Sequence, residues 1–122
     1  MRDNSQAITE LSALLGERLV TSAADLTLHG QNETYYPNTP PDAVAYPETT
    51  EEVSQILKIC HAQECPVVAY GAASSLEGQH LAVAGGISLD MSRMARVLSL
   101  DAEDLKVTVQ PGITRKSLNE EL

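Results

Sequence analysis

Residues 43–70 read AVAYPETTEEVSQILKICHAQECPVVAY, and this stretch decides the fold. It begins with a short apolar run at 43–46, closed by Pro47, and ends with a second apolar run at 67–70, which follows Pro66. Short apolar runs bounded by turn residues are typical of buried strands. We therefore expect a strand at each end of the stretch, the second one fully buried.

The segment between the two runs carries the pattern of an amphipathic helix. Thr49 and Glu52 have the spacing of a capping box, in which each side chain satisfies a free backbone N–H at the helix start. The apolar residues that follow recur at i, i+3, i+4 and i+7, and are Val53, Ile56, Leu57 and Cys60. The pattern predicts a helix over 50–64 with this face on the sheet. A helical crossover joins parallel strands, so we expect 43–46 and 67–70 to be neighbouring parallel strands of a βαβ unit.

The chain before this unit contains one further helical pattern. From Ser5 onward, apolar residues recur at helical spacing until Gly16, a favoured helix stop, and are Ile8, Leu11, Leu14 and Leu15. Residues 21–42 contain glycine, asparagine and proline breakers and are expected to be loop. We therefore divide the chain into a helix with its connector, 1–42, and the main body, 43–122.

The chain after the unit predicts a third strand, a hairpin and a last helix. The strand is expected within 82–90, and the hairpin from 97–100 and 105–109 around the acidic turn 101–104, a solvated tip. In the second hairpin strand Leu105, Val107 and Val109 alternate with polar residues, which indicates a half-buried strand. Thr114 can cap the last helix, with Ile113 and Leu118 as a hydrophobic staple.

Composition excludes several functional classes. The 122 residues are 43% hydrophobic and 20% charged, which suits one globular domain. Eight Lys and Arg against 17 Asp and Glu give a net charge of −9, which repels nucleic acids and anionic membranes. No apolar stretch approaches the ~20 residues of a transmembrane helix, and the N-terminus has no signal-peptide core. We expect a cytoplasmic protein whose two cysteines are reduced thiols.

A loop of small residues, 71–79, follows the second strand. Loops at the carboxyl end of strands bind ligands in open α/β sheets. Gly71 and Gly78 bracket it, and its consecutive N–H groups, with the hydroxyls of Ser74 and Ser75, can form an anion-binding nest. Neither a P-loop nor a G-x-G-x-x-G motif is present. No Lys or Arg lies between Lys58 and Arg93, so we expect neutral dipoles to hold a diphosphate. The alternative is a purely structural turn.

Four ordered stretches, 42–53, 66–79, 85–94 and 107–119, together resemble a known family. In order and spacing they are similar to the start of the FAD-binding domain of FAD-linked oxidases, the vanillyl-alcohol-oxidase or PCMH type. Within that type the chain looks most like the group of cytochrome-type D-lactate dehydrogenase and glycolate oxidase. The resemblance implies an α+β fold, the first lobe of a two-lobed domain, with a small parallel βαβ sheet, a hairpin and flanking helices.

The resemblance also implies FAD as the cofactor, with its pyrophosphate wrapped by the loop. The residues that would hold it are Tyr70, Gly71, Ala72, Ala73, Ser74, Ser75, Leu76, Gly78 and Gln79. Ala73 stands where the family usually has a second glycine, and its Cβ would narrow the approach of the backbone.

The family's second lobe and its substrate domain, with metal-binding histidines, are expected to be absent from these 122 residues. No catalytic or metal-binding residue is therefore assigned. We expect the FAD-binding portion of an FAD-linked D-2-hydroxyacid dehydrogenase, which self-associates through surface that the missing lobe would cover. One alternative is a truncated lobe that acts only as a structural or interaction module. Another is a protein that binds a different diphosphate nucleotide.

The remaining candidates are cysteines and histidines. Cys60, His61 and Cys65 could suggest a metal cluster, but a structural site needs about four converging ligands, so we interpret the cysteines as core or surface thiols. His29 and His80 are lone histidines in predicted loops and are expected to be solvent-exposed. His80 adjoins the small-residue loop, which leaves approach to a cofactor as its alternative role.

Overall fold

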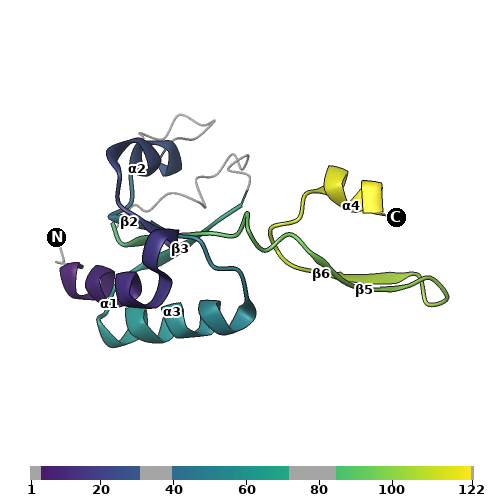
Figure 1. The fold of residues 1–122 in the computed structure, drawn as a ribbon, viewed down its shortest axis with the longest axis horizontal. Helices are drawn as coiled ribbons and strands as arrows, with labels where there is room; N and C mark the ends of the chain where they lie inside the picture. The colour runs from purple at the N-terminus through teal and green to yellow at the C-terminus, as the bar shows by residue number, and fades with distance from the viewer. Residues whose placement is uncertain (1–3, 31–39, 72–84, 122) are drawn as a thin grey trace.

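The computed structural model describes residues 4–30, 40–71 and 85–121, which form two sheets and flanking helices (Figure 1). A four-stranded sheet has the order β1-β2-β4-β3, and a two-stranded sheet pairs β5 with β6. In chain order the elements are α1 (Ser5–Leu15), the 3-10 helix η1 (Gly16–Arg18), β1 (Leu19–Val20), α2 (Ala23–His29), β2 (Ala43–Ala45), α3 (Thr50–Ala62), β3 (Val67–Tyr70), β4 (Ile87–Asp90), β5 (Val97–Asp101), β6 (Lys106–Val109) and α4 (Arg115–Glu121). None of the helices in these described ranges is long and apolar enough to cross a membrane.

The prediction that β2 and β3 are neighbours is wrong, because β4 lies between them. Both strands pair in parallel with β4, so they are parallel to each other as expected. All four residues of β4 are buried, and the central place in a sheet is the one covered on both faces. β3 is consequently an edge strand of the described sheet and only partly buried, contrary to expectation. On the opposite edge, β1 pairs antiparallel with β2, and two residues are too few to give a sequence pattern.

The start of α3 confirms the cap. Thr49 Oγ1 accepts a hydrogen bond from the N–H of Glu52 at 3.2 Å. The Glu52 carboxylate accepts from the N–H of Glu48 at 2.8 Å, one residue before the position that a standard capping box uses. The helix ends at Ala62, two residues before the predicted end, where the chain enters a left-handed conformation at Glu64 (φ 54°).

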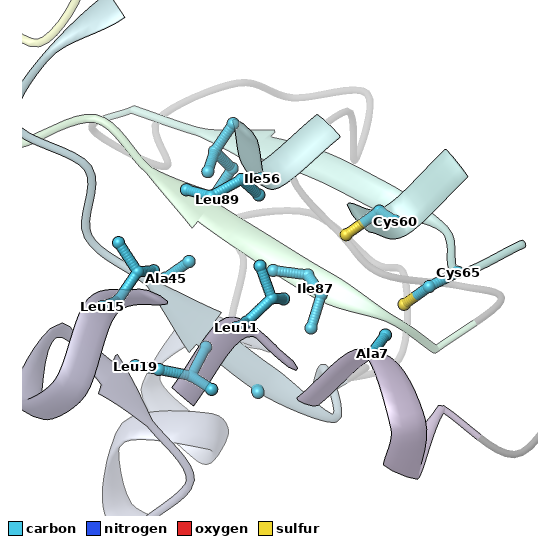
Figure 2. Close-up of a cluster of buried hydrophobic side chains, with 11 residues drawn as sticks. Ala7, Leu11, Leu15, Leu19, Ala45, Ile56, Cys60, Cys65, Ile87 and Leu89 are labelled. Carbon is cyan, nitrogen blue, oxygen red and sulfur yellow. The ribbon is translucent and has the colours of Figure 1, made fainter. Parts of the chain in front are cut away.

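The core lies on one face of the sheet, under α1 and α3 (Figure 2). From α3, Ile56 and Cys60 are buried in it, while Val53 and Ile59 pack at its margin. Leu57 is 46% exposed, so its predicted place on this face is wrong. The buried face is centred near Ile56, and the next residue along a helix is rotated by about 100°. The cluster is formed by Ala7, Leu11, Leu15, Leu19, Ala43, Ala45, Ile56, Cys60, Cys65, Ile87 and Leu89.

The predicted loop 21–42 contains a helix, α2, so that expectation is wrong over Ala23–His29. Ser22 caps the helix, its Oγ accepting from the N–H of Asp25 at 3.4 Å and donating to the Asp25 carboxylate at 2.7 Å. The glycine, asparagine and prolines further along dominated the sequence pattern. Figure 1 shows α2 on the face of the sheet opposite α1 and α3. Residues 31–39 lie outside the described part of the chain.

The hairpin and the last helix form as predicted. β5 and β6 pair antiparallel, with a register irregularity between Val97 and Ser99, and the acidic turn is exposed at the tip. Leu105 is the exception: it lies in the turn at φ 56° and is 91% exposed, so it is not part of the half-buried strand. At α4, Thr114 Oγ1 accepts from the N–H of Ser117 at 3.2 Å, which confirms the cap.

An ion pair joins η1 to the start of α3. The Arg18 guanidinium donates two hydrogen bonds to the Glu52 carboxylate, one of them at 2.6 Å, and a third to the carbonyl oxygen of Tyr46 at 3.3 Å. Two parallel bonds of this kind are geometrically specific. They lower the pKa of Glu52 from 4.5 to about 2, the Arg18 hydrogen bond being the largest cause.

The contrast between Ile56 and Leu57 gives a stability test. Ile56→Ala removes a fully buried side chain, and we expect a loss of about 2–5 kcal/mol in the free energy of unfolding from transfer and cavity terms. Leu57→Ala, the matched control on the same helix, is expected to cost less than about 1 kcal/mol because half of that side chain is already in water. Urea denaturation followed by circular dichroism measures both, and equal losses would contradict the described packing.

The Arg18–Glu52 pair predicts a loss of stability in acid. The pKa of Glu52 is lower in the folded chain than in the unfolded chain, so the stabilisation is complete above about pH 4.5 and is lost as the pH falls towards 2. We expect the pair to contribute about 1–3 kcal/mol, since it is only partly buried. Urea denaturation of Glu52→Gln between pH 6 and pH 2.5 should show a correspondingly flatter profile than the parent protein. Superimposable profiles would show that the pair does not stabilise the fold.

Candidate cofactor-binding site

A pocket lies at the carboxyl edge of the four-stranded sheet. β3 and β4 end side by side, with Tyr70 paired to Asp90, and the chain leaves them at Gly71 and Met91. Next to these ends is a hollow of about 380 Å³. Its lining residues are Gly71, Ser92, Pro111, Gly112, Ile113, Thr114 and Arg115. The pocket therefore joins the start of the small-residue loop to the segment between β6 and α4.

Gly112 allows the second wall of the pocket to form. Its N–H donates to the carbonyl oxygen of Met94 at 2.7 Å, which holds the turn after β6 against the turn after β4. A Cβ at this position would lie 1.7 Å from the carbonyl oxygen of Met91, a distance that no side chain could occupy. Glycine is thus required here by the close approach of two backbones.

Gly71 stands in the opposite situation. A Cβ added to it meets no atom within 4 Å among the described residues, and its φ is not in the left-handed region. Neither packing nor conformation therefore requires a glycine at this position. An alanine side chain here would occupy open space at the pocket, where a ligand could approach the backbone closely.

The residues that line the pocket include a cationic one, Arg115, which the sequence interpretation missed. The N–H groups of Ser92, Gly112 and Ile113 are already bonded inside the protein, to Asp90 Oδ1 and to the carbonyl oxygens of Met94 and Gln110 respectively. An anion here would therefore depend on the Arg115 side chain as well as on the loop amides. The expectation of neutral dipoles considered only charges near the loop in sequence. The sequence signal that could have indicated Arg115 was the capped helix start that follows Pro111 and Gly112.

Most of the predicted loop residues lie outside the described part of the chain. Of the candidates, Tyr70 and Gly71 lie in the described part of the chain. The others lie outside it, as does His80, and they are Ala72, Ala73, Ser74, Ser75, Leu76, Gly78 and Gln79. The anion-binding nest therefore stays a prediction.

His29 is buried, which corrects the expectation of a solvent-exposed loop residue. It is the last residue of α2, and only 2% of its surface is exposed. Its Nε2 lies 2.7 Å from Asp90 Oδ2, and its Nδ1 lies 2.8 Å from the carbonyl oxygen of Asp25. Its ring is 4.3 Å from the ring of Tyr70, centroid to centroid. No local pattern connects residues 29 and 90, so the sequence could not indicate this contact.

The two tyrosines beside His29 are neutral phenols at ordinary pH. Burial raises the pKa of Tyr70 and of Tyr46, and the nearby Asp90 carboxylate raises both further. The Arg93 guanidinium lies 5.2 Å from the centre of the Tyr46 ring, a cation–π contact. This end of the sheet is thus a polar, aromatic cluster on the face opposite the hydrophobic core.

The cysteines belong to the core. Both are free and buried, and burial raises the pKa of Cys60 to about 12, which disfavours the thiolate that a metal would need. Within residues 4–30, 40–71 and 85–121, no three His, Cys, Asp or Glu side chains converge as a metal site would require.

Comparison with known sequences identifies the family to which this α+β domain belongs. The FAD binding domain family matches residues 41–122. The chain belongs to this family. It is an FAD-binding domain, with FAD as its cofactor.

Curated relatives share substantial identity with the chain. The mitochondrial cytochrome-type D-lactate dehydrogenase of Arabidopsis thaliana is 43% identical over 119 residues, covering 96% of this chain and 21% of the relative. A probable mitochondrial D-lactate dehydrogenase of Danio rerio is 44% identical over 91 residues, covering 75% of this chain and 18% of the relative. The chain thus spans about a fifth of the length of these two relatives.

Solved structures share the fold. An alkyldihydroxyacetonephosphate synthase superimposes with a TM-score of 0.89 at 22% identity, over 98% of this chain and 25% of that one. A p-cresol methylhydroxylase superimposes with a TM-score of 0.78 at 23% identity, over 94% of this chain and 23% of that one. The α+β architecture expected from the resemblance is therefore confirmed, with a mixed rather than wholly parallel sheet.

The described residues fit one part of FAD. The pocket volume lies at the lower end of the range for small-molecule sites, which suits a portion of the cofactor rather than the whole molecule. Arg115 offers positive charge, and Gly71 leaves open space for a diphosphate to approach the backbone.

Proposed function

We propose that this chain is the portion of an FAD-linked D-2-hydroxyacid dehydrogenase, of the D-lactate or glycolate type, that holds the diphosphate of FAD. The observation that carries the proposal is the pocket that Gly71 and Arg115 share at the carboxyl edge of the sheet. The relatives named D-lactate dehydrogenase support the substrate class.

Each part of the chain has a defined role in this proposal. The loop residues Tyr70, Gly71, Ala72, Ala73, Ser74, Ser75, Leu76, Gly78 and Gln79 bind the pyrophosphate through their amides and hydroxyls. Arg115 adds a cation from the other wall of the pocket. The chemistry that FAD supplies in such enzymes is acceptance of a hydride from the α-carbon of a 2-hydroxy acid. No residue of this chain is assigned a catalytic role, because the substrate would meet other parts of a longer protein.

We further propose that other segments of the longer protein, its second lobe and substrate domain, cover the hairpin. Leu98 and Leu100 are more than half exposed, and Leu105 is 91% exposed. Figure 1 shows β5 and β6 running away from the four-stranded sheet, with α4 beside them. Apolar side chains gathered on one projecting element mark a contact surface. In the 122-residue chain alone, a second copy would take the place of those segments.

The domain division and the cellular location also belong to this proposal. The family match begins at residue 41, which supports a boundary near residue 42 between 1–42 and 43–122. A cytoplasmic location stays a prediction, since the Arabidopsis and Danio relatives are named as mitochondrial proteins.

A titration with FAD tests the cofactor site. Arg115→Ala should weaken FAD binding about tenfold, or 1.4 kcal/mol, because it removes the cation of the pocket. Gly71→Ala should weaken it similarly by placing a Cβ in the ligand's space, while changing the free energy of unfolding by no more than about 0.5 kcal/mol. The measurement is the change in flavin fluorescence on binding to the purified chain.

The control for this titration is Lys116→Ala, which removes the same charge from the next residue of α4, outside the lining of the pocket. Equal binding by the parent and both pocket variants, or equal weakening by Lys116→Ala and Arg115→Ala, would contradict the proposed site. Absence of flavin binding by the parent, and by a longer protein that includes its downstream sequence, would instead favour the non-catalytic module.

Sedimentation velocity tests the uncovered hairpin. We expect the parent chain to self-associate with rising concentration, and the double variant Leu100→Lys, Leu105→Lys to sediment as a monomer, because charges replace the exposed apolar contacts. Leu57→Lys, an equally conspicuous exposed leucine on α3, is the control and should behave like the parent. A parent that stays monomeric at high concentration would show that the hairpin surface needs no cover.

A further inference from the structure

His29 connects an element outside the family match to the ends of β3 and β4, after which two residues line the pocket. α2 precedes residue 41, where the match begins. The Nε2 of His29 meets Asp90 Oδ2, while Asp90 Oδ1 accepts from the N–H of Ser92 at 2.8 Å. The imidazole also lies against the ring of Tyr70, the residue before Gly71. Gly71 and Ser92 both line the pocket. The buried His29 side chain therefore contacts Tyr70, which precedes Gly71, and Asp90, which is hydrogen-bonded to Ser92.

The hydrogen bonds of His29 fix the number of protons that the pair holds. The carbonyl oxygen of Asp25 can only accept, so Nδ1 must carry a proton. A neutral imidazole would then present a lone pair at Nε2, and an ionised Asp90 presents only lone pairs, which would place two acceptors 2.7 Å apart in a buried site. Such a contact is repulsive unless a further proton lies between the two atoms. The proton can reside on either atom, and both arrangements leave the pair with no net charge.

We propose that His29 and Asp90 share one proton, and that this bridged pair is a positioning device that holds the ends of β3 and β4, from which Gly71 and Ser92 enter the pocket. The role of the device for the cofactor rests on the proposed function, whereas the shared proton does not.

The surroundings leave no other partner for this proton among the described residues. The titratable and charged groups that face the pair are Tyr46 after β2, Tyr70 on β3, Asp25 on α2 and Arg93 after β4. Both tyrosines have a raised pKa and stay uncharged across neutral pH. Arg93 lies over Tyr46, and its guanidinium pairs with Glu48 rather than with Asp90.

The substitution Asp90→Asn is the control for the shared proton. Its amide N–H₂ can donate to Nε2 of a neutral His29, while its oxygen still accepts from the N–H of Ser92. Asp90→Asn therefore preserves each hydrogen bond without the additional proton. The parent needs that proton, and the unfolded parent at pH 8 does not carry it, since free histidine is then neutral and free aspartate ionised.

The pH dependence of unfolding distinguishes the two proteins. The folded parent holds one proton more than the unfolded chain at pH 8, so its unfolding constant should rise with pH relative to that of Asp90→Asn. Both proteins retain Cys60 and Cys65, so any contribution of the thiols cancels in the comparison. Urea denaturation of the full 122-residue chain measures the difference. Parallel pH profiles would overturn the shared proton.

Positioning is tested separately by nuclear magnetic resonance at pH 7. His29→Ala should shift the backbone amide signals of Gly71 and Ser92, whereas His61→Ala, which removes an exposed histidine from α3, should leave them unchanged. Asp90→Asn should keep the Gly71 signal near its parent position. Unchanged Gly71 and Ser92 signals in His29→Ala would overturn the positioning role. If His29→Ala does not fold, a displaced Gly71 signal in Asp90→Asn would overturn it instead.

Flavin titration then links the device to the cofactor. His29→Ala should weaken FAD binding about tenfold, whereas Asp90→Asn alone should bind FAD with near-parent affinity. If neither the parent nor a longer protein that includes its downstream sequence binds FAD, the proposed function is rejected, while the Gly71 and Ser92 signals still decide the positioning role. A parent that binds FAD with the same affinity as a folded His29→Ala would reject the role of the pair at the pocket.

Discussion

The alternation of side chains along β4 is the constraint on which the rest of the structure depends. Successive residues of a strand point to opposite faces, so Ile87 and Leu89 join the hydrophobic core while Asp90 lies on the other face with α2. The start of the strand is fixed closely: a Cβ on Gly86 would lie 2.2 Å from the carbonyl oxygen of Pro66. A shift of one residue would bring Asp90 into the core and Ile87 onto the polar face. The core and the polar cluster therefore depend on one register.

The same register determines where a ligand can bind. Because β2, β3 and β4 are parallel, their carboxyl ends meet at one edge, and the chain segments that leave β3 and β4 begin there. The core helices α1 and α3 cover the face of the sheet opposite α2, and none of their residues lines the pocket (Figure 1). The hydrophobic core thus lies on one face of this small sheet, and the pocket lies at its carboxyl edge. The hydrogen bond between His29 and Asp90 holds α2 on the sheet, and its two residues also contact Tyr70 and Ser92, next to or in the lining of the pocket.

Local patterns predicted what short-range physics controls, and failed where distant residues meet. The cap at Thr49, the strands of the hairpin and the helix before Gly16 each depend on residues a few positions apart, and each was predicted. The insertion of β4 between β2 and β3 was missed, because pairing order depends on which strand can be buried on both faces. The burial of His29 was missed for a related reason: its partner is 61 positions away. Leu57 shows a smaller failure, since apolar spacing alone does not fix the centre of the buried face.

The candidate site was predictable only in part, and the distribution of charge explains why. The chain carries a net charge of −9, which opposes a diphosphate, yet five of its eight lysines and arginines follow residue 92. The same segment holds five of the 17 acidic residues, so it is neutral, and the excess negative charge belongs to the first 92 residues. The wall of the pocket that carries Arg115 comes from this neutral segment, whereas Gly71 comes from the acidic one. A diphosphate between them would meet open backbone on one side and a cation on the other. In the proposed site, Gly71 gives a phosphate access to the backbone, and a segment far away in sequence gives the charge. A search for basic residues near the loop could therefore find only half of the site.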